Sequence, residues 1–67
     1  MQVEITAESG RKFCVFIKFD RSMQYSHRAY CSMFERYGKN ARDAVTNLME
    51  AIGEKINAQI LDKAGIF

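Results

Sequence analysis

The chain has 67 residues, of which 48% are hydrophobic and 12% aromatic, and a net charge of +2 at pH 7. This length favours one domain over residues 1–67, and the composition is that of a globular chain rather than a disordered one. Such a small charge does not indicate nucleic-acid binding by itself. A domain of this size buries only about 60% of its unfolded surface, so its stability is thin and a homodimer is expected.

The residues that bear chemistry argue against several kinds of site. The chain has no Cys-x-x-Cys pair. Its two cysteines, Cys14 and Cys31, and its single histidine, His27, are too few for a zinc site, so no metal or cofactor is expected. The first residues lack the basic-then-apolar pattern of a signal peptide, and no apolar run approaches the roughly 18 residues of a membrane span. We therefore expect a cytoplasmic protein without membrane contact, whose cysteines are free thiols, with a disulfide as the alternative.

Residues 3–19 alternate apolar and polar side chains as a β-hairpin does. Gly10 marks the turn between the two strands. The alternating apolar positions are Val3, Ile5, Ala7, Phe13, Val15, Ile17 and Phe19.

The loop length sets which residues of this hairpin face each other. A three-residue loop over residues 9–11 would place Ile5 opposite Val15 and Glu8 opposite Lys12. All the alternating apolar residues would then share one face. A two-residue loop would turn one strand over relative to the other, so we reject it.

A third strand is expected over residues 27–37, after a polar turn at residues 20–26 and before Gly38. Both of its faces carry apolar residues, so the pattern leaves the orientation open. We expect the smaller set to point inward, under the helix, because Arg28 and Arg36 flank the other set. The inward set is Ala29, Cys31 and Met33, and the outward set is Tyr30 and Phe34.

An amphipathic helix is expected from Asn40 to about Ala64, with Gly65 as its stop. Asn40 has the capping side chain, and Asp43 lies favourably in the first turn. Gly53 is expected to weaken the helix by about 1 kcal/mol without breaking it. The apolar stripe that predicts this helix consists of Ala41, Val45, Leu48, Met49, Ile52, Ile56 and Ile60.

A helix of this length would be roughly 37 Å long and would overhang strands of roughly 30 Å. Leu61, Ile66 and Phe67 would then have little of their own domain beneath them. We expect a second chain to cover these three residues, and the alternative is a tail folded back onto the same core. The predicted fold is α+β: a three-stranded antiparallel sheet followed by one long C-terminal amphipathic helix packed on one face.

The joint between the third strand and the helix, "YGKNARDAVTNLMEAI", resembles the small HicB-like β-β-β-α domain. The resemblance covers about a third of the chain and implies an antitoxin-like regulator that binds a protein. A proline-containing acidic loop is usual after the second strand of that family, whereas this chain has no proline. The matching positions are Gly38, Asn40, Asp43, Ala44, Asn47, Leu48 and Ala51.

A double-stranded RNA-binding domain has the same three strands followed by a final helix. The segment "GKNARDA" resembles the basic start of that helix. That resemblance implies phosphate contacts from Lys39 and Arg42. This chain lacks the leading helix of that family, and the negative charge of Asp43 would repel phosphate. RNA binding therefore stays as an alternative to protein binding.

No nucleophile, base and orienting group can be assembled from the sequence, and the glycines do not form a phosphate loop, so we expect no enzyme. The expected binding surface is the sheet face away from the helix, with Leu61, Ile66 and Phe67 as a separate dimer contact. Tyr, Phe and Arg dominate protein hot spots, while cations and aromatics also suit single-stranded nucleic acid. The expected partner-binding residues are Lys12, Phe16, Lys18, Arg28, Tyr30, Phe34 and Arg36.

From these residues we expect a small non-enzymatic protein-binding regulator, antitoxin-like or a phage-type inhibitor. It would act through its open sheet face or an edge strand, as a homodimer. Glu4 and Glu8 would repel phosphate, which favours protein as the partner. The alternative is a module that binds RNA or single-stranded nucleic acid through the basic and aromatic face.

Overall fold

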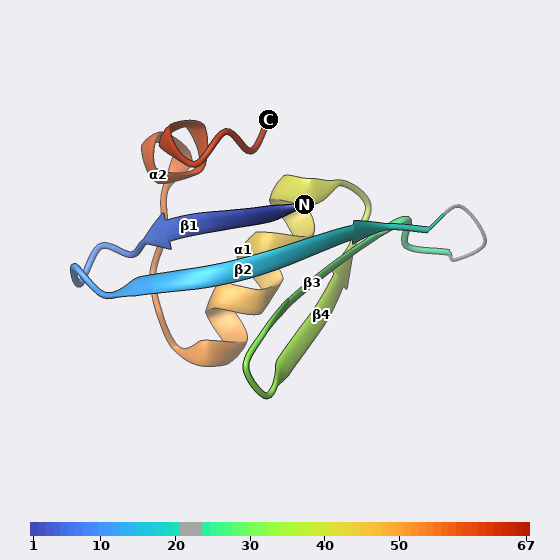
Figure 1. Ribbon diagram of the computed structural model, residues 1–67, viewed down its shortest axis with the longest axis horizontal. Coiled ribbons are helices and arrows are strands. Elements are labelled where there is room, and N and C mark those ends of the chain that lie inside the picture. The colour runs from blue at the N-terminus through green and yellow to red at the C-terminus, as the bar shows by residue number, and fades with distance from the viewer. Residues whose placement is uncertain (21–23) are drawn as a thin grey trace.

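Four consecutive strands form one antiparallel sheet in the computed structural model, which describes residues 1–20 and 24–67 (Figure 1). The strands are β1 (Gln2–Thr6), β2 (Lys12–Phe19), β3 (His27–Cys31) and β4 (Phe34–Gly38), in the spatial order β1-β2-β3-β4. Two helices follow, α1 (Ala41–Ile52) and α2 (Ala58–Lys63). The α+β class is confirmed, but three strands and one long helix were predicted, so the finer architecture is different. Within the described residues, neither helix is long and apolar enough to cross a membrane.

The hairpin of β1 and β2 turns one residue earlier in the chain than the sequence predicts. Ile5 lies opposite Phe13, and Val3 lies opposite Val15. The Ala7 N–H donates to the Arg11 carbonyl (2.8 Å) and closes a three-residue loop over residues 8–10, so the predicted loop length is correct, but the pairing is shifted by two positions. A shift of two residues does not exchange the faces of a strand, because side chains alternate with a period of two. The predicted faces are therefore kept.

The predicted third strand is two strands, β3 and β4, joined by a two-residue turn at Ser32 and Met33. Cys31 and Phe34 are the closing pair of this hairpin. Ser32 has a backbone φ of 55°, which is unusual for a residue other than glycine. Met33 projects from the turn with 92% of its surface exposed, so its predicted inward position is wrong.

This turn changes the faces of the residues that follow it. Directly opposed residues of an antiparallel pair share a face. Phe34 therefore lies on the face of Cys31, and Arg36 lies on the face of Ala29, which is buried under α1. The prediction that Phe34 and Arg36 lie on the outward face is wrong for this reason.

Helix α1 begins where the sequence predicts and ends earlier. The Asn40 side chain accepts a hydrogen bond from the Asp43 N–H (2.8 Å), which confirms the cap. At the other end Gly53 has a φ of 91°. Its N–H donates to the Glu50 carbonyl (3.1 Å), and the Glu54 N–H donates to the Met49 carbonyl (2.9 Å). These two bonds form a Schellman motif, so Gly53 ends the helix and the predicted continuation through it is wrong.

The chain then turns back toward β1 through α2. Asn57 caps α2 by accepting from the Ile60 N–H (3.0 Å). Leu61 and Ile66 are only 6% and 1% exposed, and both belong to the core of their own domain. The prediction that a second chain buries these two residues is wrong, and the folded-back tail is correct, because the break at Gly53 redirects the chain. Phe67 remains exposed.

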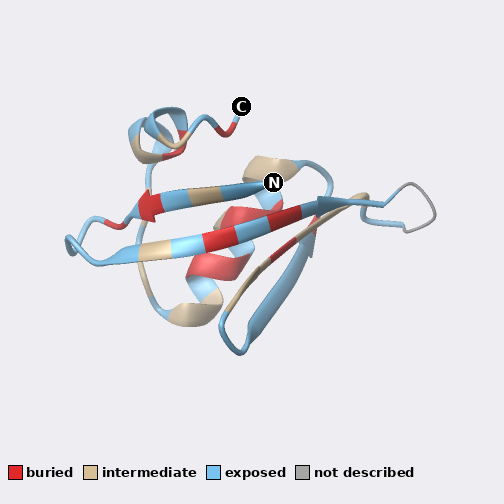
Figure 2. Cartoon of the chain, viewed as in Figure 1, coloured by how far each residue is buried: buried red, intermediate tan, exposed pale blue. Residues whose placement is uncertain are grey.

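The core lies between one face of the sheet and the two helices (Figure 2). From this face the strands bury side chains against Ala44, Val45, Leu48 and Met49 of α1. Leu61 and Ile66 extend this core. Helix α2, which carries Leu61, lies beside β1 (Figure 1). The buried residues of the sheet and its first loop are Ile5, Ala7, Val15, Ile17 and Ala29.

Candidate protein-binding face

The outer face is defined here as the face of the sheet that points away from α1. The strand pairings arrange its side chains in rows. One row runs Gln2, Phe16, Tyr30 and Glu35, and the next runs Lys18, Arg28 and Tyr37. Two further pairs between β1 and β2 complete the outer face: Glu4 with Cys14, and Thr6 with Lys12. Within the described part of the chain, neither helix packs over this face (Figure 1).

An aromatic pair lies at the centre of the outer face. The rings of Phe16 and Tyr30 stack with centroids 5.2 Å apart and planes inclined by 13°. Their backbones are directly opposed on β2 and β3, which sets this distance. Offset-stacked rings stabilise each other beyond simple burial, so the pair is held in one geometry before any partner arrives.

A polar network continues from this pair to the edge strand. The Arg28 guanidinium lies 5.1 Å from the centre of the Tyr30 ring and 3.6 Å from the Glu35 carboxylate. The Tyr37 hydroxyl donates to the same carboxylate (2.8 Å). This hydrogen bond raises the pKa of Tyr37 above its ordinary value, because it stabilises the protonated phenol beside a carboxylate. Glu35 thus holds Arg28 and Tyr37 together.

A hollow of about 340 Å³ lies at the end of the outer face, where β2 and β3 lead into the segment that joins them. Lys18, Arg28 and Tyr37 line it from the sheet, and Asp20 and Tyr25 line it from the connecting segment. His27 also borders it and contacts the Ser26 hydroxyl (2.8 Å) and the Phe19 ring. Predictions that fall on residues 21–23, within the expected polar turn, lie outside the described residues.

The structure brings together five of the seven predicted partner-binding residues. These five are Lys12, Phe16, Lys18, Arg28 and Tyr30. Phe34 and Arg36 lie on the opposite side of the sheet. Glu35 and Tyr37 take their places on the outer face, and the sequence analysis missed both. Recognition of the turn at Ser32 and Met33 would have found them, because it fixes the faces of β4.

The two cysteines lie on opposite faces of neighbouring strands and are both free thiols. Cys14 is exposed on the outer face, where the Gln2 amide contacts its sulfur (2.8 Å). Cys31 lies on the helix side, where burial raises the pKa of its thiol. The predicted absence of a disulfide agrees with this arrangement.

Both edges of the sheet are partly covered. On β4 the carbonyls of Glu35 and Tyr37 point away from β3 and accept hydrogen bonds from the side chains of Arg36 (2.7 Å) and Asn47 (2.9 Å). On the opposite edge α2 lies beside β1 (Figure 1). The occupied carbonyls of β4 make that edge less open to the addition of another strand.

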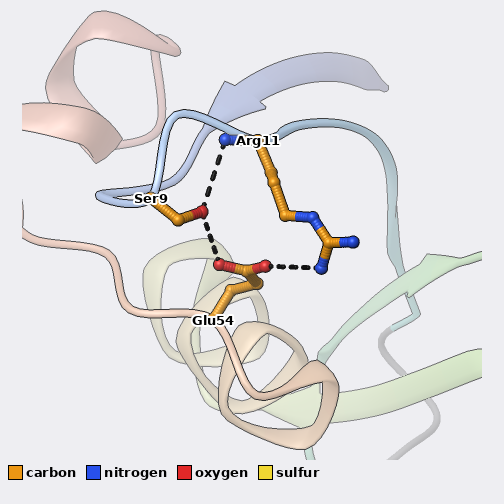
Figure 3. Close-up of polar contacts among 3 residues, drawn as sticks. All are labelled: Ser9, Arg11 and Glu54. Atoms are coloured by element: carbon orange, nitrogen blue, oxygen red, sulfur yellow. Dashed lines mark hydrogen bonds and ion pairs between the residues drawn. The ribbon is translucent and has the colours of Figure 1, made fainter.

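A separate polar cluster stabilises the fold at the other end of β2 (Figure 3). The Ser9 hydroxyl donates to one oxygen of Glu54 (2.8 Å), and the Arg11 guanidinium donates to the other (3.2 Å). These contacts lower the pKa of Glu54, the hydroxyl contributing most. They tie the β1–β2 loop to the segment that follows α1, so this cluster has a structural explanation.

Comparisons with known proteins name no relative for this arrangement. No protein-family model, curated protein or solved structure matches the chain. In the described residues, no three His, Cys, Asp or Glu side chains are grouped so that they could hold a metal ion. The geometry of the outer face is therefore the basis for inferring a function.

Proposed function

We propose that this chain is a small non-enzymatic, cytoplasmic regulator that binds another protein through its outer face, as an antitoxin-like or phage-type inhibitor of the HicB-like kind does. The observation that carries the proposal is the stacked pair of Phe16 and Tyr30, flanked by Arg28, on a sheet face that neither helix covers. Tyr and Arg are enriched in protein hot spots, where preorganised anchors lower the entropic cost of binding.

The arrangement of the rings favours protein over nucleic acid as the partner. Stacking of bases needs free ring faces. Phe16 and Tyr30 already stack on each other, and the Arg28 guanidinium also lies over the Tyr30 ring. Glu4 and Glu35 lie on the same face and would repel phosphate.

The same geometry favours the face over the edges as the binding surface. Strand addition needs an edge with free backbone groups. The side chains of Arg36 and Asn47 occupy two edge carbonyls of β4, and α2 flanks β1. A homodimer through the outer face is the second occupant to be tested, since a domain of this size gains stability from a partner.

The test is a capture experiment with the immobilised full chain and a lysate of its source cells. Phe16→Ser combined with Tyr30→Ser should weaken capture of the protein partner at least about 30-fold, as expected for hot-spot residues. Phe34→Ser is a matched control, because Phe34 and Phe16 are both 38% exposed but lie on opposite faces. The control should bind as the unchanged chain does.

Two further conditions separate the occupants. Capture of a protein partner should survive nuclease treatment and a rise from about 0.05 M to about 0.5 M salt, which screens exposed charges. Recovery of nucleic acid whose binding falls steeply with salt would replace the proposal with RNA binding. Sedimentation equilibrium of both variants shows whether a second copy occupies the face, because only then would the double variant alone shift from dimer to monomer.

A further inference from the structure

Two cations lie directly opposite each other on the outer face. Lys18 of β2 pairs in register with Arg28 of β3. Like charges in opposed positions destabilise a sheet. Arg28 has Glu35 nearby at 3.6 Å, whereas none of the described residues forms an ion pair or a hydrogen bond with the Lys18 ammonium group. The sequence thus places a repulsive pair in a sheet that is otherwise regular, and such departures are expected at functional sites.

These two cations line the same hollow of about 340 Å³. Its other walls include the rings of Phe19, Tyr25 and Tyr37. Among the described residues that line the hollow, Asp20 carries the one carboxylate. Two cations that line one hollow both attract an anion held there, so their attractions add.

From this arrangement we propose that the hollow is an anion subsite of the protein-binding face, which takes the carboxylate of an aspartate or glutamate side chain of the partner. The inference rests on the proposed function. Phe16 and Tyr30 each lie two residues from the cation of their own strand, or about 7 Å along it. The recognised feature is therefore an acidic side chain about 7 Å from an apolar one.

The charges around the hollow favour a carboxylate over a phosphate group. A phosphate carries nearly two negative charges at neutral pH. It would meet the Glu35 carboxylate, which lies 3.6 Å from the Arg28 guanidinium. A carboxylate carries one charge and accepts two parallel hydrogen bonds from a guanidinium. Its size and charge suit one arginine and one lysine.

The first experiment measures the melting temperature of Lys18→Gln. Removal of one of the opposed cations should raise it by about 1 to 4 °C, because the repulsion is lost. Lys12→Gln is the matched control on the same strand and face. Lys12 lies opposite the uncharged Thr6, so the melting temperature of the Lys12→Gln variant should not rise. If the melting temperature of Lys18→Gln equals that of the unchanged protein, Lys18 and Arg28 do not repel each other and the premise is wrong.

The second experiment titrates the isotope-labelled full chain with a blocked peptide, Gly-Phe-Ser-Glu-Gly, and follows the amide resonances. Saturable shifts should be centred on Phe16, Lys18, Arg28 and Tyr30. Glutamine in place of the glutamate, or Lys18→Gln in the protein, should each weaken binding about tenfold, as the loss of a charge-assisted hydrogen bond does. Lys63→Gln, on α2 and away from the outer face, should leave it unchanged.

The outcomes separate this inference from the proposed function. Equal binding of the glutamate and glutamine peptides would overturn the anion subsite, while loss of partner capture in the Phe16 and Tyr30 variant would leave the proposed function standing. Tighter binding of a phosphoserine peptide than of the glutamate peptide would also overturn it, because the subsite would then be one for phosphate. If the Phe16 and Tyr30 variant captures the partner normally, the proposed function itself fails.

Discussion

The two faces of the sheet are built from the same strands and differ in almost every physical respect. On the inner face Val15 is fully buried against the helices, whereas its neighbour Phe16 is 38% exposed on the outer face. The buried centre of the inner face is aliphatic. The outer face combines a stacked aromatic pair with an arginine, two glutamates and two lysines.

Under the proposed function, this difference separates stability from binding within a chain of 67 residues. Alternation along a strand sends successive side chains to opposite faces. Changes on the inner face should therefore reduce the stability of the fold, and changes on the outer face should alter recognition with small effects on stability. The following variants test that division, beginning with the largest expected effect.

Leu48→Ala tests the inner face at its centre. Leu48 is fully buried in the core on α1. Truncation of such a residue leaves a cavity and should cost roughly 2 to 5 kcal/mol of unfolding free energy, most of what a small domain has. Urea denaturation measures the loss. Glu50→Ala on the same helix is exposed and should change stability by less than about 0.5 kcal/mol. Equal effects of the two variants would contradict the assigned core.

Gly38→Ala tests the seam between the inner face and the start of α1. A Cβ atom at Gly38 would overlap the backbone nitrogen of Ala44 and lie 2.7 Å from the carbonyl carbon of Asp43. Backbone atoms cannot move aside as a flexible side chain can, so overpacking should cost about 1 to 3 kcal/mol. Lys39→Ala beside it is the control. If Gly38→Ala has the same unfolding free energy as the unchanged protein, α1 does not approach the sheet this closely.

Glu54→Gln tests the polar contact at the rim of the core. The pKa of Glu54 is lowered in the fold by Ser9 and Arg11. Its stabilising contribution is therefore present above the ordinary glutamate pKa of about 4.3 and is lost as the pH falls through the lowered native value. Denaturation at about pH 7 and about pH 3 should show the variant less stable only at the higher pH. A deficit of the same size at both values would contradict an ionic contribution.

Ser32→Gly tests the turn that places Phe34 on the inner side. Ser32 has a φ of 55°, which glycine adopts without a steric penalty. The variant should gain about 0.5 kcal/mol, the relief of strain exceeding the added entropy of the unfolded chain. Ser32→Ala keeps a Cβ atom and should show no gain. Identical melting curves for the two variants would argue against this turn.

Much of this division could be predicted from the sequence. Strict alternation placed Val15 and Ile17 inward and Phe16 and Lys18 outward, and these faces survived a two-residue error in the pairing. Asn40 was correctly predicted as the helix cap. Local patterns of this kind are reliable because a face depends on the parity of a position and not on its partner.

The errors arose where a local signal was weak or ambiguous. The turn at Ser32 and Met33 contains no glycine, asparagine or proline, so nothing in its residues signalled a turn with a positive φ. Because this turn was not predicted, Glu35 and Tyr37 were assigned to the wrong face of the sheet.

The end of α1 was ambiguous for a different reason. Gly53 is tolerated inside some helices, and Ile56 and Ile60 continue the apolar stripe in phase although Ile56 lies outside any helix. Burial of these residues by a non-helical path could not be seen from periodicity alone. The second capping residue, Asn57, was the signal that the helix had been interrupted.

The most direct test of the division between the faces compares two adjacent residues. Val15→Ser and Phe16→Ser place the same side chain one residue apart, on opposite faces of β2. Urea denaturation of both variants should show a loss of about 2 kcal/mol or more for Val15→Ser and less than about 1 kcal/mol for Phe16→Ser. Comparable losses in the two variants would mean that the outer face is part of the core, and the division of roles would be wrong.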